Sequence, residues 1–313
     1  MRTASHRGIS ERHVYLVAPL VGLLLLASVA GSIGPGVALA ASHASNTKSV
    51  DGVPVTGLLA TIEKQGYIVM GNTELNPPES YLNTTTARWL GIDADVSRQI
   101  AKSLGVGLRG VPLTGAAQVP AVQSGRVDAM IGLFYTSVRA QVVDYNKVPY
   151  WYVGDMVVTQ KTNTGLTKLS NLRGLTIGVV RGSAQEIEAT AFVKDFGVKS
   201  VVEYPDSQSM LSDVADGRLE SAIWWGFEFQ WALKQNPSLN LRRVFVIPPG
   251  YLGEKKLNPT YIVFPKSPSS DNLSKVVDNI ITKMRADGEL KTIFAKFGLK
   301  DSSYLTGLAS KSS

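Results

Sequence analysis

Short apolar segments alternate with amphipathic segments from residue 67 to residue 297, and this alternation predicts the secondary structure. The clearest amphipathic segment covers 271–286, where apolar side chains recur at the spacing of one helix face: Leu273, Val276, Val277, Ile280, Ile281 and Met284. Further helices are expected at 94–104, 119–124, 137–143, 184–196, 209–216, 227–234 and 290–297. Strands are expected at 67–71, 107–112, 129–133, 156–160, 176–180, 200–204, 221–224, 241–246 and 261–264. Strands that alternate with helices are typical of an α/β fold.

The first 40 residues have the pattern of a secretory signal peptide. Three arginines precede an apolar run over 14–30, and the small-residue sequence Ala38-Leu39-Ala40 follows. We expect cleavage after about Ala40, export to the periplasm, and a flexible leader over 41–55. Because the run is near the lower limit of roughly 17 residues for a membrane span, a retained membrane anchor is the alternative. Prolines within and after the run favour cleavage.

The residue composition removes several classes of chemistry. The 313-residue chain has no cysteine, so disulfides, thiol nucleophiles, cysteine-ligated zinc and iron–sulfur clusters are excluded. The three histidines are His6, His13 and His43, so the folded part has no imidazole for a Ser–His relay or a zinc site. The formal net charge of +7 is spread along the chain, so nucleic acid is not expected as a partner. We expect neither a metal nor a cofactor.

Three segments of similar sequence predict turns that follow a helix. They are Ser124-Gly125-Arg126, Asp216-Gly217-Arg218 and Asp287-Gly288-Glu289. In the first two, we expect a helix to end at a glycine in left-handed conformation, after which an arginine and an acid precede a buried strand. Structure alone explains these turns, and their repetition suggests two similar half-units.

Two helix starts carry chemistry suited to a carboxylate. Thr136 is placed to cap the helix that carries Arg139, whose planar guanidinium grips a carboxylate through two hydrogen bonds. Ser183 and Glu186 fit a capping box at the start of the predicted helix 184–196. Both starts follow the carboxyl end of a predicted strand, the edge of an open α/β sheet where ligands bind. Each motif by itself also has a purely structural interpretation: Arg139 as a solvated helix residue, and Ser183 as an ordinary helix cap.

The order of these motifs resembles the polar-amino-acid-binding family of periplasmic solute-binding proteins of ABC importers, bacterial extracellular solute-binding protein family 3. That family has a Pro-Pro loop, then Gly-hydrophobic-Asp-x-Asp, Ser-Gly-Arg-Val-Asp-Ala and Thr-x-x-Arg, and it ends on Phe-x-Lys-Phe-Gly. The matching segments here are Pro77-Pro78, Gly91-Ile92-Asp93-Ala94-Asp95, 124–129, 136–139 and Phe294-Ala295-Lys296-Phe297-Gly298. The ordered match covers about residues 60–300.

The resemblance implies the two-lobed periplasmic-binding-protein fold of type II. In this α/β fold, two lobes joined by two hinge strands close on a ligand. We place lobe 1 at 56–157 and 262–301, lobe 2 at 158–261 and a C-terminal tail at 302–313. The two hinge crossings are expected near 158–160 and 261–264.

The resemblance also implies which residues bind the ligand. The family arginine that holds the ligand α-carboxylate corresponds to Arg139, and the Ser or Thr of the helix-start loop corresponds to Ser183. Three positions depart from the family pattern. Asn76 and Gly115 stand where aromatic residues are usual, and Trp225 stands where an acid usually pairs with the ligand ammonium.

The absence of that acid changes the expected ligand. An enclosed ammonium without a counter-charge costs several kcal/mol, whereas a tryptophan face returns only about 0.5–2 kcal/mol. We therefore expect an amino acid or related small carboxylate stacked on Trp225, with its amino group absent or differently placed; a core or hinge role for Trp225 is the alternative. Glu79 and Glu228 are interpreted as surface acids, with a role as the missing counter-charge as their alternative. The expected ligand-binding set is Arg139, Ser183, Trp225, Asn76, Gly132 and Phe134.

Together these inferences predict an exported, monomeric solute-binding protein, not an enzyme, that delivers its ligand to an ABC permease in the inner membrane. Two alternatives stay open. One is a periplasmic enzyme on the same scaffold, similar to cyclohexadienyl or arogenate dehydratases, whose general acid would have to be Glu79, Glu228, a lysine or a tyrosine. The other is a ligand-sensing domain that contacts a receptor.

Overall fold

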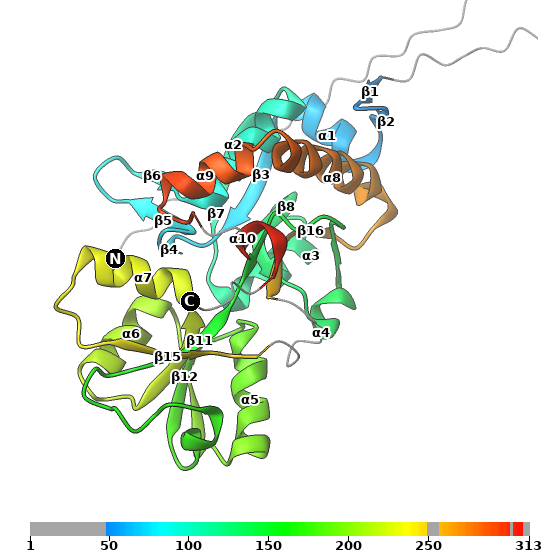
Figure 1. Cartoon of the computed structure of the whole chain (residues 1–313). Coiled ribbons are helices and arrows are strands. Elements are labelled where there is room, and N and C mark those ends of the chain that lie inside the picture. Colours follow the sequence, from blue (N-terminus) through cyan, green and yellow to red (C-terminus); the bar gives the residue numbers. More distant parts are fainter. Residues whose placement is uncertain (1–47, 249–256, 301–302, 309–313) are drawn as a thin grey trace, which may run out of the picture. The chain divides into compact units, whose positions relative to one another are not determined.

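The computed structural model describes residues 48–248, 257–300 and 303–308, all within the compact unit Asn46–Ser313. The predicted signal peptide and the first part of the predicted leader lie outside the described residues. No helix in the described ranges is long and apolar enough to cross a membrane. Two large sheets, each accompanied by helices, organise this part of the chain (Figure 1).

The first sheet has six strands in the order β10-β16-β8-β3-β7, with β9 beside β16. Strands β3, β7 and β8 are parallel to one another, whereas β16 runs antiparallel to β8, β9 and β10. The strand bounds are β3 Tyr67–Asn72, β7 Gly107–Pro112, β8 Ala129–Phe134, β9 Val143–Tyr145, β10 Trp151–Val153 and β16 Asn258–Pro265. The helices of this half are α1 Gly57–Gln65, α2 Ile92–Leu104, α3 Gln118–Gln123, α4 Ser137–Ala140, α8 Asp271–Ala286 and α9 Glu289–Lys296.

The second sheet has five strands in the order β13-β12-β14-β11-β15. Strand β12 is parallel to β13 and β14, and β11 is antiparallel to β14 and β15. The strand bounds are β11 Asp155–Thr159, β12 Thr176–Val180, β13 Ser200–Tyr204, β14 Ser221–Trp225 and β15 Arg242–Val246. The accompanying helices are α5 Gln185–Phe196, α6 Ser207–Ala215 and α7 Gly226–Gln235. The two sheets with their helices correspond to the two α/β lobes of the prediction.

The chain passes between the two sheets twice. It leaves the first sheet after Val153 and enters the second at Asp155, so Gly154 forms the outward crossing. It returns between Val246 and Asn258, the first residue of β16. The predicted lobe limits at 157/158 and 261/262 therefore fall inside strands β11 and β16, a few residues late. An apolar segment predicts a strand, but it does not predict which of the two sheets the strand joins, so the sequence alone does not locate the crossings.

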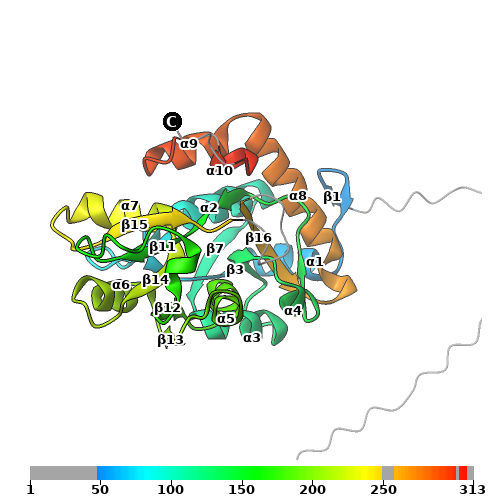
Figure 2. The same ribbon diagram turned by 60° about the horizontal axis from the view of Figure 1, so that its bottom comes forward.

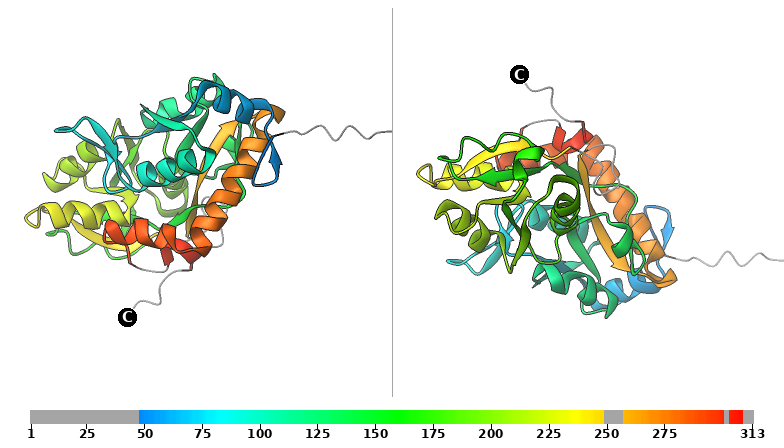
Figure 3. Two further views of the ribbon diagram at one scale, coloured as in Figure 1. Left: turned by 90° about the horizontal axis from the view of Figure 1, so that it is seen from above. Right: turned by 90° about the horizontal axis from the view of Figure 1, so that it is seen from below.

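Helix α8 has the predicted bounds, and all six residues of its predicted apolar stripe are buried. Its buried face lies against α1 and α2, and its start lies beside the short hairpin formed by β1 (Ser49–Val50) and β2 (Val53–Pro54) (Figures 2 and 3). Apolar side chains of β3 and α2, such as Ile68, Met70 and Ile100, belong to the same buried cluster. The periodicity thus identified a helix because that helix covers one continuous core.

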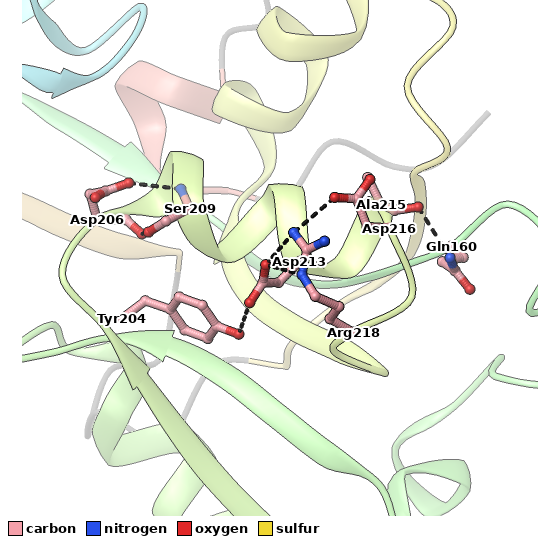
Figure 4. A network of polar contacts seen from close by, with 8 residues as sticks. All are labelled: Gln160, Tyr204, Asp206, Ser209, Asp213, Ala215, Asp216 and Arg218. Atoms are coloured by element: carbon pink, nitrogen blue, oxygen red, sulfur yellow. Dashed lines mark hydrogen bonds and ion pairs between the residues drawn. The ribbon is translucent and has the colours of Figure 1, made fainter.

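The three predicted turns contain glycines in left-handed conformation. Gly125, Gly217 and Gly288 have φ angles of 69°, 77° and 81°. Near the second turn, Arg218 pairs with Asp213 at 2.6 Å, and the hydroxyl of Tyr204 donates to the same carboxylate at 2.8 Å (Figure 4). Arg218 also pairs with Asp216 of the turn at 2.8 Å, and Glu220, the acid before the strand, accepts from the Thr176 backbone N–H at 2.6 Å. Structural contacts therefore account for the arginine and the acid of this turn.

Several segments differ from the sequence-based expectation. The predicted flexible leader forms the hairpin β1–β2 from Ser49 onward, and Lys48 pairs with Glu63 of α1 at 2.7 Å. The predicted tail contains α10 (Ser303–Thr306), whose Leu305 carbonyl accepts a bond from Arg285 at 2.5 Å. The predicted helix 137–143 stops at Ala140, because the chain then turns to pair as β9 with β16.

A third, small sheet was not predicted. It contains β4 (Leu75–Asn76), β5 (Ser80–Asn83) and β6 (Arg88–Leu90) in antiparallel order. The loop between β4 and β5 holds Pro77-Pro78, whose peptide bond is cis. Three single turns of 3₁₀-helix complete the described elements: η1 Gly115–Ala117, η2 Leu169–Leu172 and η3 Pro268–Ser270.

Candidate functional site

A cavity of about 570 Å³ opens at the carboxyl ends of strands from both sheets. Its wall comes from the segments that follow β3, β7, β8, β12, β13 and β14. This is the edge of open α/β sheets where ligands are held. The structure brings all six predicted ligand-binding residues to this one wall: Asn76, Gly132, Phe134, Arg139, Ser183 and Trp225.

Arg139 stands at the base of the cavity and touches both halves of the molecule. Thr136 caps its helix as predicted, since the Thr136 hydroxyl accepts from the Arg139 backbone N–H at 3.1 Å. The guanidinium donates to the Phe134 carbonyl at 3.1 Å and, across the cavity, to the Gly182 carbonyl at 2.6 Å. Burial lowers the pKa of Arg139, yet a guanidinium stays protonated in proteins. Arg139 is therefore a fixed cation of the cavity wall.

Ser183 lies in the loop between β12 and α5, directly after Gly182, whose carbonyl accepts from Arg139. The predicted capping box is wrong, because Glu186 accepts from the backbone N–H of Gly182 at 2.7 Å instead. The Ser183 hydroxyl oxygen is consequently buried without a hydrogen-bond partner among the described residues. Buried polar atoms are rarely left unpaired, so this hydroxyl is available to a polar group in the cavity.

Trp225 ends β14 and closes one side of the cavity. Its ring lies 5.4 Å from Phe134 in an edge-to-face arrangement and 5.7 Å from Phe227 in a stacked arrangement. The indole nitrogens of Trp224 and Trp225 are both buried and have no acceptor within the described part of the chain. Trp225 therefore combines the predicted wall position with the alternative role as a core aromatic.

Asn76 joins the small sheet to the second half. Its side-chain oxygen accepts from Ser207 Oγ at 3.3 Å, and its nitrogen donates to Thr73 Oγ1 at 3.3 Å. The Leu75 carbonyl also accepts from Ser207 Oγ at 3.3 Å. Together with the Arg139–Gly182 bond, these contacts hold the two walls of the cavity against each other.

Three carboxylic acids that lie in different elements meet beside the cavity. Glu79, Asp93 and Glu228 are 1%, 1% and 3% exposed, so the interpretation of Glu79 and Glu228 as surface acids is wrong. Only Glu79 also lines the cavity. Asp93 Oδ1 accepts from the Tyr150 hydroxyl at 2.6 Å. One oxygen of Glu79 and one of Glu228 lack hydrogen-bond partners in the described structure.

The ionisation of this acid cluster follows from its burial. Burial raises the pKa of Asp93 to about 7, although the bond from Tyr150 acts in the opposite direction. Burial raises the pKa of Glu79 well above its usual range, and the charges of Asp93 and Glu228 raise it further. Buried carboxylates gain most from an opposite charge placed nearby. The cluster is therefore suited to a cationic group that enters past Glu79.

Among the described residues, no group of Asp, Glu, His or Cys side chains has the geometry to hold a metal ion. From the sequence, Glu79 and Glu228 are interpreted as surface acids, with the role of counter-charge as their alternative, and neither Asp93 nor Tyr150 is named as a site residue. The signal was present for Asp93, which opens a helix in the Gly-hydrophobic-Asp motif with an apolar residue on each side. No comparable signal exists for Tyr150, since one tyrosine among several carries no mark of burial.

Gly132 marks the point where the cavity floor meets the acid cluster. Its φ is +90°, and a Cβ atom there would lie 2.8 Å from Asp93 Oδ2. Gly132→Ala should therefore lower the free energy of unfolding by about 1–2 kcal/mol through backbone strain and by about 1–3 kcal/mol more through overpacking. Gly125→Ala is the matched control, because Gly125 has a φ of +69° and open space around it. Equal losses for the two variants in urea denaturation would contradict this packing.

Comparisons with known proteins agree with this geometry. Bacterial extracellular solute-binding proteins, family 3, match this chain over residues 68–300. The probable amino-acid-binding protein YxeM of Bacillus subtilis is 25% identical over 250 residues, which cover 76% of this chain and 86% of the relative. The arginine-binding extracellular protein ArtP of the same organism is 24% identical over 231 residues, or 74% and 85% of the two chains.

Solved structures show the same architecture. An ancestral arginine-binding protein bound to arginine superposes with a TM-score of 0.66 at 27% identity, covering 74% of this chain and 98% of the other. An arginine-binding protein from T. maritima, 22% identical, gives a TM-score of 0.67 over 77% of this chain and 99% of its own, and it supports the fold alone. The predicted type II fold is confirmed. The family match spans most of the chain and includes every wall segment of the cavity, so this protein belongs to family 3 of the bacterial extracellular solute-binding proteins.

Proposed function

We propose that the cavity binds an amino acid and that the loaded protein delivers it, outside the cytoplasmic membrane, to an ABC permease. Arg139 and Ser183 would hold the ligand α-carboxylate, and the acid cluster of Glu79, Asp93 and Glu228 would face a cationic group of the ligand. The observation that carries this proposal is that the wall of one cavity holds both a fixed cation, Arg139, and a buried, incompletely paired acid, Glu79.

The carboxylate end is supported by the donors that surround it. A guanidinium offers a planar set of N–H groups that matches a carboxylate, and the Ser183 hydroxyl adjoins it without a partner in the described residues. Both groups lie near the first turn of α5, where free backbone N–H groups and the helix dipole favour an anion. Three independent features thus favour negative charge at the same end of the cavity.

From the sequence we expect a ligand whose amino group is absent or differently placed, and the acid cluster favours the second of these. That expectation rested on Trp225 standing where the family has an acid. The buried acid cluster supplies negative charge from other positions of the fold, with Glu79 on the cavity wall. An ammonium enclosed next to these carboxylates no longer lacks a counter-charge. An α-ammonium and a cationic side chain share this chemistry.

The relatives agree with such a ligand. Both curated relatives reported above are described as amino-acid-binding or arginine-binding proteins, and the superposed ancestral protein holds arginine. These descriptions are of binding proteins, which supports transport over catalysis. The bonds from Arg139 to Gly182 and from Ser207 to Asn76 join the two cavity walls, as lobe closure on a ligand requires.

Calorimetry on the refolded, ligand-stripped protein tests the proposal. The panel contains L-arginine, L-glutamine, agmatine and 5-guanidinopentanoate; the last two are arginine without its carboxylate and without its α-amino group. We expect L-arginine to bind and agmatine to fail, because agmatine has no carboxylate to pair with the charge of Arg139. Loss of binding with 5-guanidinopentanoate places the α-ammonium at the acids, whereas retained binding places the side-chain guanidinium there. Absence of binding by all amino acids, or equal binding of agmatine and L-arginine, would contradict the proposal.

A further inference from the structure

Gln185 connects the cavity to the two crossings of the chain. It is the first residue of α5, it is fully buried, and it lines the cavity beside Ser183. Its Nε2 donates to Asp155 Oδ1 at 2.6 Å. Its Oε1 is buried and has no donor among the described residues. One side chain of the cavity wall thus has a bonded donor and an acceptor that lacks a partner in the described residues.

Asp155 ties both crossings together. It is the first residue of β11, directly after the crossing at Gly154. Its second carboxylate oxygen accepts from the side-chain nitrogen of Asn258. Asn258 is the first residue of β16 after the return crossing, and its backbone pairs with that of Val153. A single buried carboxylate therefore links the outgoing strand, the returning strand and the start of α5.

We propose that Gln185 is a positioning residue that couples occupancy of the cavity to the two crossings. Its Oε1 accepts a hydrogen bond from an N–H donor of the bound ligand, while its Nε2 holds Asp155 and, through it, Asn258. This inference rests on the proposed function for the ligand donor only. The bond to Asp155 and the bond from Asp155 to Asn258 exist without a ligand.

The coupling follows from the cost of an unpaired acceptor. A buried carbonyl oxygen without a donor is destabilising relative to a paired one, so in the empty cavity the Gln185 amide is held at its Nε2 end alone. A ligand donor that pairs Oε1 fixes the amide, and the amide then fixes Asp155. The charged or titratable side chain that also faces Asp155 is that of Glu188, one turn along α5, which is likewise buried. The charge of Asp155 raises the pKa of Glu188, whereas the hydrogen bonds that support the Asp155 carboxylate come from Gln185 and Asn258.

Hydrogen–deuterium exchange of the full protein tests the coupling with L-arginine as the probe. In wild type, saturating L-arginine should slow amide exchange at least fivefold in two places: the cavity wall around 181–187 and the crossings around 153–158 and 257–262. In Gln185→Met, saturating L-arginine should still slow amide exchange in the cavity wall. At the crossings, it should change the exchange rate less than twofold. Gln118→Met is the matched control, because Gln118 is another buried glutamine of the cavity wall and makes no bond to Asp155. It should behave as wild type at the crossings.

A ligand-free arm separates this inference from the proposed function. Without L-arginine, exchange at the crossings should be at least fivefold faster in Gln185→Met than in wild type or Gln118→Met. Gln185→Asn, which is too short to reach both Asp155 and the cavity, should give the same result if Gln185→Met fails to fold. If L-arginine does not change amide exchange in the wild-type protein, the proposed ligand is overturned. The comparison without L-arginine would still test the role of Gln185. Crossings that exchange alike in all variants would overturn the inference.

Discussion

Arg139→Ala is expected to abolish amino-acid binding while the protein still folds. Removing one partner of an enclosed, hydrogen-bonded charge pair costs about 2–5 kcal/mol, which is a roughly 30- to 4,000-fold weaker affinity. The same substitution removes the 2.6 Å bond to the Gly182 carbonyl, so it also weakens the contact between the two cavity walls. Calorimetry with L-arginine measures the loss directly.

Two further variants separate charge from geometry. Arg139→Lys keeps a positive charge but loses the planar donor pair, so it should recover only part of the affinity. Arg181→Ala is the matched control, since Arg181 is an exposed arginine in the loop before α5 that pairs with Glu203. Its affinity should equal that of wild type. If Arg139→Ala weakens the affinity for L-arginine less than fivefold, Arg139 does not bind the ligand carboxylate.

The acid cluster is expected to make ligand affinity and stability depend on pH in opposite directions. Burial raises the folded-state pKa of Glu79, Asp93 and Glu228, so the ligand-free protein holds protons that the unfolded chain has lost. Stability from these groups is fully present below the ordinary carboxyl pKa values of about 4. It is lost as pH rises through about 7 for Asp93, and as pH rises through the raised pKa values of Glu79 and Glu228 for those two groups. The free energy of unfolding should fall by up to about 1.4 kcal/mol per pH unit for each retained proton. A cationic ligand displaces these protons, so its affinity should rise over the same interval.

Proton release during binding provides the measurement. Titrations of L-arginine in two buffers with different ionisation enthalpies should show protons released at pH 6, and urea denaturation should show ligand-free stability falling between pH 5 and pH 7. Glu79→Gln should reduce the proton release and the preference for a cationic ligand. Glu74→Gln is the matched control, because Glu74 lines the same cavity outside the cluster. Affinity that is independent of pH, or equal effects of the two variants, would contradict a cation site at Glu79.

The second buried acid pair contributes to the same stability profile. Burial raises the pKa of Asp155 to about 7, with the bonds from Gln185 and Asn258 opposing the shift, and it raises that of Glu188 well above its usual range. These groups face each other near the crossings and lie apart from Glu79. The Glu79→Gln variant should therefore remove only part of the pH dependence of unfolding but most of the pH dependence of binding.

The sequence was informative wherever a local pattern determines the structure. The strands 107–112, 176–180 and 200–204 and the helix 271–286 have the predicted bounds, because a continuous core on one face imposes a regular apolar spacing. Arg139 and Ser183 were found because each follows a strand at a helix start. The cavity position of these residues was thus predictable from short-range signals.

The features that were missed depend on contacts between distant segments. Glutamates usually lie at the surface, but Glu79 and Glu228 are buried where the small sheet lies against α6 and α7 of the second half. The single apolar residues of β4–β6 are too few to give a period. The hairpin β1–β2 and the helix α10 are too short to show a period in sequence, and they lie against α8 and β10. None of these contacts leaves a mark on neighbouring residues in the chain.

The most direct test of the proposed ligand site is a crystal structure of the refolded protein with L-arginine. We expect one ligand in the cavity, with its α-carboxylate about 3 Å from the Arg139 guanidinium and the Ser183 hydroxyl. A cationic group of the same ligand should lie within hydrogen-bond distance of Glu79. An arginine bound with its carboxylate toward the acid cluster, or bound outside the cavity, would contradict the assignment of the two ends.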